Sequence, residues 1–198
     1  MCRLLCSAFT VIAIITSIYG EGKNMPTTLS GKNVLMIIAA ERFQDEEFAQ
    51  PYNLFTRLGA TVKLACSRKG IVKGIFGRQL TPDFLIGACK ADDYDAVVFI
   101  GGPGATEYFN NSDAHALARD AVSKSKVLGA ICIAPVTLAN AGVLKGKKAT
   151  VFPSEQSQLV SQGARLIQQN VVVDGKIVTA AGPQAAREFA ETLARLIQ

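Results

Sequence analysis

Gly129-Ala130-Ile131-Cys132-Ile133-Ala134-Pro135 decides the fold, because it joins the end of an apolar strand to the start of a helical segment. Ala130 and Ala134 stand two residues before and after Cys132. Small residues at these places are typical of a nucleophile elbow, a tight strand-to-helix turn that lifts one side chain out of the sheet. The pattern therefore predicts that Cys132 is presented at the edge of a sheet.

The position of Cys132 also predicts its chemistry. The free amides and the dipole of a helix N-terminus favour a thiolate and lower the pKa of a cysteine from about 8.5 to about 3.5–7.5. We therefore expect a reactive thiol with a lowered pKa. A structural cysteine buried in the core is the alternative interpretation.

Apolar runs alternate with helical periodicity along most of the chain. Strands are expected at 33–39, 61–65, 95–100, 127–131 and 149–152, and helices at 46–58, 114–123 (capped by Ser112 or Asp113), 133–141, 155–162 and 185–197. Two hairpins are expected, one within 70–80 and one around Asp174-Gly175. The alternation predicts an α/β fold, with a mostly parallel sheet covered by helices on both faces. Active sites of such sheets lie beyond the carboxyl ends of the strands.

Gly101-Gly102-Pro103-Gly104 follows one of these buried strands. A phosphate-binding loop would need the spacing GxGxxG or a following Gly-Lys-Ser/Thr, and neither is present. Glycines also let backbone N–H groups approach a developing negative charge. We expect the amides of Gly102 and Ile133 to bind an oxyanion. A simple strand-end turn is the alternative.

An acidic cluster of Glu41, Asp45, Glu46 and Glu47 follows the first strand. Acidic residues at a helix start commonly just complement the helix dipole. Glu47 differs, because it lies on the first helical turn within reach of the elbow. Beside a thiolate, a carboxyl is stable only if it keeps its proton and donates a hydrogen bond to sulfur. The sequence therefore predicts that Glu47 is buried, with a raised pKa and a titration coupled to that of the thiol.

The first residues have the features of a targeting segment. Arg3 precedes an apolar run from Ala8 to Ile18, and Gly20 and Gly22 are small residues at a potential cleavage site. We expect a signal peptide over residues 1–22, a linker over 23–31 and a single domain over 32–198. The apolar run is short for a bilayer, so no stable membrane span is expected. A signal peptide implies export to the periplasm or the medium, whereas translation from Met25 would give a cytoplasmic protein.

Composition excludes several classes of function. The net charge of +5 is scattered, so we expect no nucleic-acid partner. His115 is the only histidine and no CxxC occurs, so we expect no metal. The strand-end loops lack a Ser/Thr-rich phosphate cradle, which disfavours a flavin and leaves no cofactor expected. Whether Cys66 and Cys89 pair is open from sequence alone.

Four ordered motifs together resemble the DJ-1/PfpI superfamily. They are Asn33-Val34-Leu35 with Glu47 and Pro51, Val97 to Gly104, Ala130 to Pro135, and Asp174 to Pro183. The resemblance implies a flavodoxin-like three-layer sandwich of the class I glutamine-amidotransferase type and a homodimer or higher homo-oligomer. It also implies that Cys132 is the reactive cysteine, Glu47 the protonated glutamate that contacts it, and Gly102 and Ile133 the oxyanion-hole amides.

The chain departs from the family pattern at both places where a branch has a histidine. Ile133 stands where the protease-like branch has a histidine after the cysteine, and Phe152 where the deglycase and glyoxalase branch has one. His115 is expected on a helix surface. Glu107 is offset by about one residue from the glutamate of the protease branch, so no role is transferred to it.

The absence of both family histidines limits the reactions that the site is expected to catalyse. Positioned acid–base catalysis contributes roughly 10²–10⁴ in rate, and neither Ile133 nor Phe152 can protonate a leaving amine, so a peptidase is disfavoured. We expect a cysteine-dependent hydrolase or deglycase-like enzyme that acts on small reactive carbonyl compounds, with Glu47 as the proton shuttle. The alternative is a non-catalytic redox-sensing or chaperone-like stress protein, in which an oxidant converts Cys132 to a sulfinic acid.

Overall fold

The computed structural model describes residues 25–198, and the predicted signal peptide lies outside these residues. The strands are β1 (Asn33–Ile37), β2 (Glu41–Phe43), β3 (Thr61–Cys66), β4 (Val72–Gly74), β5 (Gln79–Leu80), β6 (Phe84–Leu85), β7 (Ala96–Phe99), β8 (Val127–Ile131), β9 (Lys148–Ala149), β10 (Arg165–Leu166), β11 (Val171–Asp174) and β12 (Ile177–Ala180). The helices are α1 (Asp45–Arg57), α2 (Ser112–Ser123), α3 (Pro135–Asn140), α4 (Gln156–Ser161) and α5 (Ala186–Ile197).

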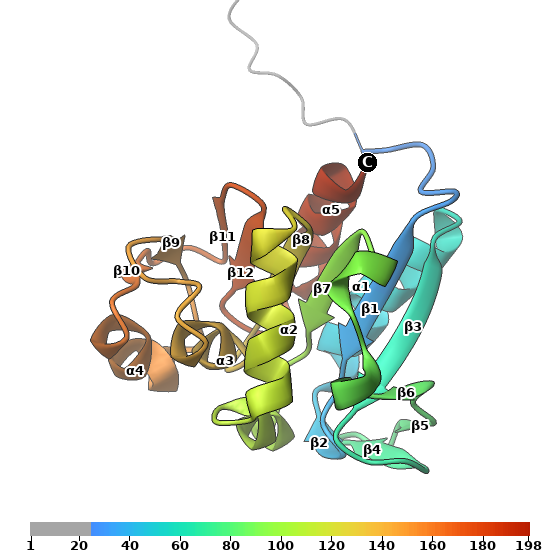
Figure 1. Ribbon diagram of the computed structural model, residues 1–198, viewed down its shortest axis with the longest axis horizontal. Helices are drawn as coiled ribbons and strands as arrows, with labels where there is room; N and C mark the ends of the chain where they lie inside the picture. The colour runs from blue at the N-terminus through green and yellow to red at the C-terminus, as the bar shows by residue number, and fades with distance from the viewer. Residues whose placement is uncertain (1–24) are drawn as a thin grey trace, which may run out of the picture.

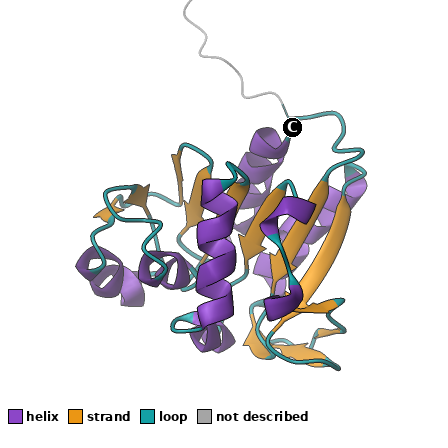
Figure 2. Cartoon of the chain, viewed as in Figure 1, coloured by secondary structure: helices purple, strands orange, loops and turns teal. Residues whose placement is uncertain are grey.

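A central sheet of seven strands is arranged in the order β11-β12-β8-β7-β1-β3-β6. Its pairings are parallel except that of the hairpin β11–β12. Helices α1 and α5 pack together behind the sheet in the view of Figure 1, and α2 crosses in front of it. Figure 2 shows the same three layers, with strands between helices. The predicted flavodoxin-like α/β sandwich is confirmed.

The inner strands have apolar side chains on both faces because helices cover both sides of the sheet. All the residues of β7 and β8 are buried, and so are Val34 to Ile37 of β1. Helix α5 contributes Phe189, Leu193 and Ile197, which share one face at a spacing of four residues and are buried. The continuous apolar runs of the sequence are therefore the middle layer of the sandwich.

Four local predictions needed correction or refinement. Helix α2 is capped by Asn111, whose Oδ1 accepts the Ala114 N–H at 2.9 Å, and not by Ser112 or Asp113. The strand expected at 149–152 ends at Ala149, because β9 pairs only with β10 in a separate sheet. The helix expected at 133–141 is regular only over α3, since the preceding residues form the elbow turn. Both hairpins are present, and the second places Gly175-Lys176 between its paired residues.

Candidate active site

The elbow at Cys132 is a strained turn held from both sides. Cys132 has φ 63°, a left-handed conformation that is uncommon for residues other than glycine. Its N–H donates to the Ala180 carbonyl at 2.9 Å, and its carbonyl accepts the Phe152 N–H at 2.8 Å. The first bond ties the turn to the end of β12, and the second ties it to the segment after β9. The predicted elbow geometry is confirmed.

The glycine turn after β7 closes against the elbow. The Gly101 N–H donates to Glu47 Oε2 at 3.1 Å. A Cβ atom on Gly101 would lie 2.5 Å from Cys132 Cβ and 2.6 Å from Glu47 Oε2, so only glycine fits here. The backbone amides of Gly102 and Ile133 both lie near the Cys132 sulfur, where they act to lower its pKa. The two amides expected to bind an oxyanion therefore converge on one atom.

Glu47 is fully buried on the first turn of α1. Its carboxyl lies beside the Cys132 thiol, and burial raises its pKa to about 8. Glu47 Oε1 has no hydrogen-bond partner within residues 25–198. This oxygen is the one that can hold the proton, because Oε2 already accepts the Gly101 N–H. The predicted burial and raised pKa of Glu47 are confirmed.

The predicted lowering of the Cys132 pKa is wrong for this site. Burial, together with the negative charge of an ionised Glu47, raises the pKa of the Cys132 thiol to about 12. The Gly102 and Ile133 amides act in the opposite direction and are outweighed. Helix α3 has only six residues, so its dipole is small. At neutral pH the pair therefore holds both of its protons.

Gln44 is a site-shaping residue that the sequence did not single out. Its backbone N–H donates to the Gly101 carbonyl at 3.0 Å. Its side-chain Oε1 accepts the N–H groups of Glu46 at 2.6 Å and Glu47 at 3.4 Å, and so caps α1. Glutamine is not among the preferred N-cap residues, so no sequence signal pointed to it. Gln44 links the turn at Gly101 to the helix that bears Glu47.

The other acidic residues of the predicted cluster have structural partners. Asp45 accepts the N–H groups of Phe76 at 2.9 Å and Arg78 at 3.0 Å, and thereby holds the turn between β4 and β5. Glu41 pairs with Arg68, and Glu46 accepts a hydrogen bond from the Gln50 side chain. These contacts leave Glu47 as the member of the cluster that faces the elbow.

Neither His115 nor Glu107 belongs to the elbow. His115 is half-buried on α2, and its Nε2 bonds to the Phe109 carbonyl at 2.9 Å. Glu107 Oε1 accepts the Ala40 N–H at 3.1 Å and the Ser67 hydroxyl at 2.9 Å, and so fastens the loop after β1. Phe152, on the segment bonded to the Cys132 carbonyl, is 37% exposed. The elbow therefore has Glu47 as its acid–base group, without a histidine.

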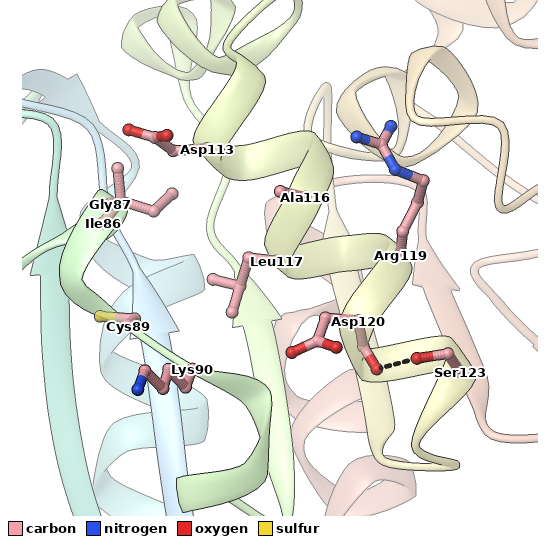
Figure 3. Close-up of a pocket in the computed structure, with 10 residues that line it drawn as sticks. All are labelled: Ile86, Gly87, Cys89, Lys90, Asp113, Ala116, Leu117, Arg119, Asp120 and Ser123. Atoms are coloured by element: carbon pink, nitrogen blue, oxygen red, sulfur yellow. Dashed lines mark hydrogen bonds between the residues drawn. The ribbon is translucent and has the colours of Figure 1, made fainter.

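Two surface hollows flank different parts of the sheet. One, of about 750 Å³, is lined by Val151, Pro153 and Ala181, which are chain neighbours of the residues that bond the Cys132 backbone. The other, of about 480 Å³, lies between the segment 86–90, which includes Cys89, and helix α2 (Figure 3). Cys66, Cys89 and Cys132 are all free thiols. Among residues 25–198, no three His, Cys, Asp or Glu side chains gather to hold a metal ion.

Residues 32–196 match the DJ-1/PfpI family. The chain belongs to this family. Deglycase PfpI of Pyrococcus furiosus is 31% identical over 149 residues, which cover 75% of this chain and 90% of that protein. An uncharacterized protein of Methanocaldococcus jannaschii is 36% identical over 201 residues, which cover 100% of this chain and 98% of the relative. Deglycase-named proteins of Pyrococcus abyssi and Pyrococcus horikoshii are 30% and 29% identical.

Solved structures of the DJ-1/PfpI family share the fold. A ThiJ/PfpI domain protein from Brachyspira murdochii aligns with a TM-score of 0.81 and 30% identity, over 83% of this chain and 95% of that one. Drosophila melanogaster DJ-1beta aligns with a TM-score of 0.75 and 32% identity, over 82% of this chain and 88% of that one. Within residues 25–198, none of the helices has the length and apolar character needed to cross a membrane.

Proposed function

We propose that this DJ-1/PfpI protein is a cysteine-dependent enzyme that acts on small reactive carbonyl compounds, with Cys132 as nucleophile and Glu47 as proton shuttle. The observation that carries the proposal is the buried contact between a protonated carboxyl and a thiol on a strained elbow. The deglycase names of several relatives at about 30% identity agree with this class of substrate.

The first step is addition of the thiol across the aldehyde of an α-oxoaldehyde. The sulfur–carbon bond forms as the carbonyl π bond breaks. Glu47 gives its proton to the new oxygen and recovers one from the thiol, so the product is a neutral hemithioacetal. The amides of Gly102 and Ile133 stabilise charge that develops during attack. Transfer of a proton between the two carbonyl carbons and hydrolysis by water then release a 2-hydroxy acid and the free thiol.

Turnover of methylglyoxal to lactate tests the proposal. Cys132→Ser should abolish the Cys132-dependent rate, and Glu47→Gln should lower kcat by roughly 10²–10⁴. Cys89→Ser is the matched control. Cys89 lies in the hollow of Figure 3, so this substitution is expected to leave methylglyoxal turnover unchanged. Equal rates in wild type and Cys132→Ser would exclude the proposed enzyme.

A redox sensor is the second candidate, and the absence of a histidine from the elbow favours it. Two molecules of peroxide convert the thiol to a sulfinic acid and are reduced to two of water. The Gly102 and Ile133 amides and the protonated Glu47 would bind the sulfinate oxygens. A mass gain of about 32 Da at Cys132 under mild peroxide, with no methylglyoxal turnover, would support the sensor. If the protein also has a chaperone-like role, its oxidised form should protect an unfolding client protein.

A homodimer is also part of the proposal. Exposed apolar side chains lie along the segment that carries β4, β5 and β6, namely Ile71, Ile75, Phe76, Phe84 and Leu85. Figure 1 shows these three strands at one end of the molecule. Burial of such side chains would favour association of two copies. Light scattering should give twice the chain mass, and a monomeric mass at micromolar concentration would refute the dimer.

The proposal that the protein is exported rests on its N-terminal sequence. A signal peptide predicts that the mature chain begins near residue 23, after small residues that suit a signal peptidase. N-terminal sequencing of the protein from its native cells separates the alternatives. A chain that begins at Met25 or Pro26 in the cytoplasm would contradict export.

A further inference from the structure

The 750 Å³ hollow beside the elbow has an unusual lining of side-chain amides. Five carboxamides and one carboxylate line it, and we call it the carboxamide cavity: Gln156, Gln168, Gln169, Asn170, Gln184 and Glu188. They come from α4, from the loop between β10 and β11, and from the turn before α5 and the first turn of that helix. Gln168, Gln169, Asn170 and Gln184 are exposed, so their polar groups face solvent and are available to a ligand.

The chemistry of this lining limits what can bind. No lysine, arginine or histidine of the described chain lines the cavity, so phosphate or carboxylate would find no positive charge there. A carboxamide both donates and accepts hydrogen bonds, and a hydroxyl group does the same. Glu188 adds a further acceptor, and Val151, Pro153 and Val171 supply apolar surface for carbon-bound hydrogens. A neutral polyhydroxylated ligand matches these features.

The cavity adjoins the segments that bond to the main chain of Cys132. Ala181, which lines the cavity, follows Ala180, the acceptor of the Cys132 N–H. Val151 and Pro153, which also line it, flank Phe152, the donor to the Cys132 carbonyl. A Cβ on Gly182 would lie 3.1 Å from the Phe152 ring, so the two wall segments are in contact beside the elbow.

We propose that the carboxamide cavity binds the neutral polyhydroxylated part of a carbonyl compound whose carbonyl carbon is attacked by Cys132. Its link to catalysis rests on the function proposed above. The preferred substrates are then sugar-derived α-oxoaldehydes that carry a hydroxylated tail. Methylglyoxal lacks this tail and uses the elbow alone.

The binding test uses D-sorbitol and the full chain. Sorbitol has no carbonyl group, so it cannot react with Cys132 and reports on the cavity alone. We expect saturable shifts of Gln and Asn side-chain NH₂ signals in ¹⁵N-labelled protein. Gln169→Leu and Gln184→Leu should each weaken binding about fivefold. Gln162→Leu is the matched control, because Gln162 is exposed at the end of α4 and does not line the cavity. No saturable shift, or equal affinity in all variants, would overturn the proposal.

The kinetic test separates this inference from the proposed function. Gln169→Leu should raise KM for 3-deoxyglucosone about fivefold and leave methylglyoxal turnover unchanged. Turnover of both compounds, with unchanged KM in the variant and no sorbitol binding, would refute the cavity and leave the enzyme standing. Sorbitol binding without any turnover would refute the enzyme and leave the cavity as a polyol site.

Discussion

The Glu47 carboxyl and the Cys132 thiol form a buried, electrostatically coupled pair where helix α1 meets the end of strand β8. Glu47 is 0% and Cys132 is 7% exposed, so water screens neither group. Two coupled groups in such contact lose their protons in steps that belong to the pair. The pKa of Glu47, raised by burial to about 8, sets the first of these steps.

The pH dependence of Cys132 alkylation follows from this pair. The rate of reaction with iodoacetamide should be low at neutral pH and should rise toward the thiol pKa of about 12. Glu47→Gln removes the negative charge that raises the pKa of the thiol, so the midpoint of this variant should move to lower pH. Peptide mass spectrometry separates Cys132 from Cys66 and Cys89. A rate that is already constant below pH 7 would show a preformed thiolate and contradict both statements.

Burial of Glu47 also links stability to pH. The pKa of Glu47 is about 8 in the folded protein, against an ordinary value of 4.5. Between these values the folded state holds a proton that the unfolded state has lost. The free energy of unfolding should therefore fall as pH rises from about 4.5 to about 8, by up to roughly 1.4 kcal/mol per pH unit. Urea denaturation at several pH values should show that the free energy of unfolding falls less steeply with pH in Glu47→Gln than in the wild type. An equal pH dependence in the two proteins would refute the linkage.

Gly101→Ala should disrupt the pair sterically. The added Cβ would lie 2.5 Å from Cys132 Cβ and 2.6 Å from Glu47 Oε2, and both belong to packed elements. We expect a loss of about 1–3 kcal/mol in stability and loss of methylglyoxal turnover. Gly142→Ala is the control: its Cβ meets no atom within 4 Å, and the left-handed backbone costs about 1 kcal/mol. A fully active Gly101→Ala would contradict the described contact.

Gln44→Ala should weaken the start of α1. It removes the acceptor of the Glu46 and Glu47 amides and leaves the backbone bond to Gly101 in place. We expect a loss of about 1 kcal/mol by thermal or urea denaturation. Gln50→Ala, which removes a side chain from the same helix and one bond to Glu46, should cost less. Equal losses would argue against a capping role for Gln44.

Phe152→His tests whether the missing base limits catalysis. The Phe152 N–H already donates to the Cys132 carbonyl, so a histidine here would sit on the segment bonded to the elbow. We expect methylglyoxal turnover to rise by roughly tenfold or more, because positioned acid–base groups contribute on this scale. Phe152→Leu should give no gain. An unchanged rate in both variants would show that acid–base catalysis at this position is not limiting.

Local patterns in the sequence determined the fold and the elements of the site. Buried strands are apolar on both faces, so the runs that became β1, β7 and β8 could be recognised without coordinates. Small residues around Cys132 marked the strained turn because such turns have no room for larger ones. The protonated state of Glu47 also followed, since a carboxyl beside sulfur in a buried site has few alternatives.

Tertiary structure decided what depends on segments distant in the sequence. The pKa of Cys132 rises because packing around the elbow excludes water and places Glu47 against sulfur, a balance that a helix-start pattern does not contain. Gln44 caps α1 because the Gly101 carbonyl holds its backbone in place. The carboxamide cavity is assembled from three separate segments, and none of them alone has a recognisable motif. Local steric constraints depend on neighbouring residues and can therefore be recognised in the sequence. The desolvation of a side chain and the convergence of polar groups depend on residues that come together only when the chain folds.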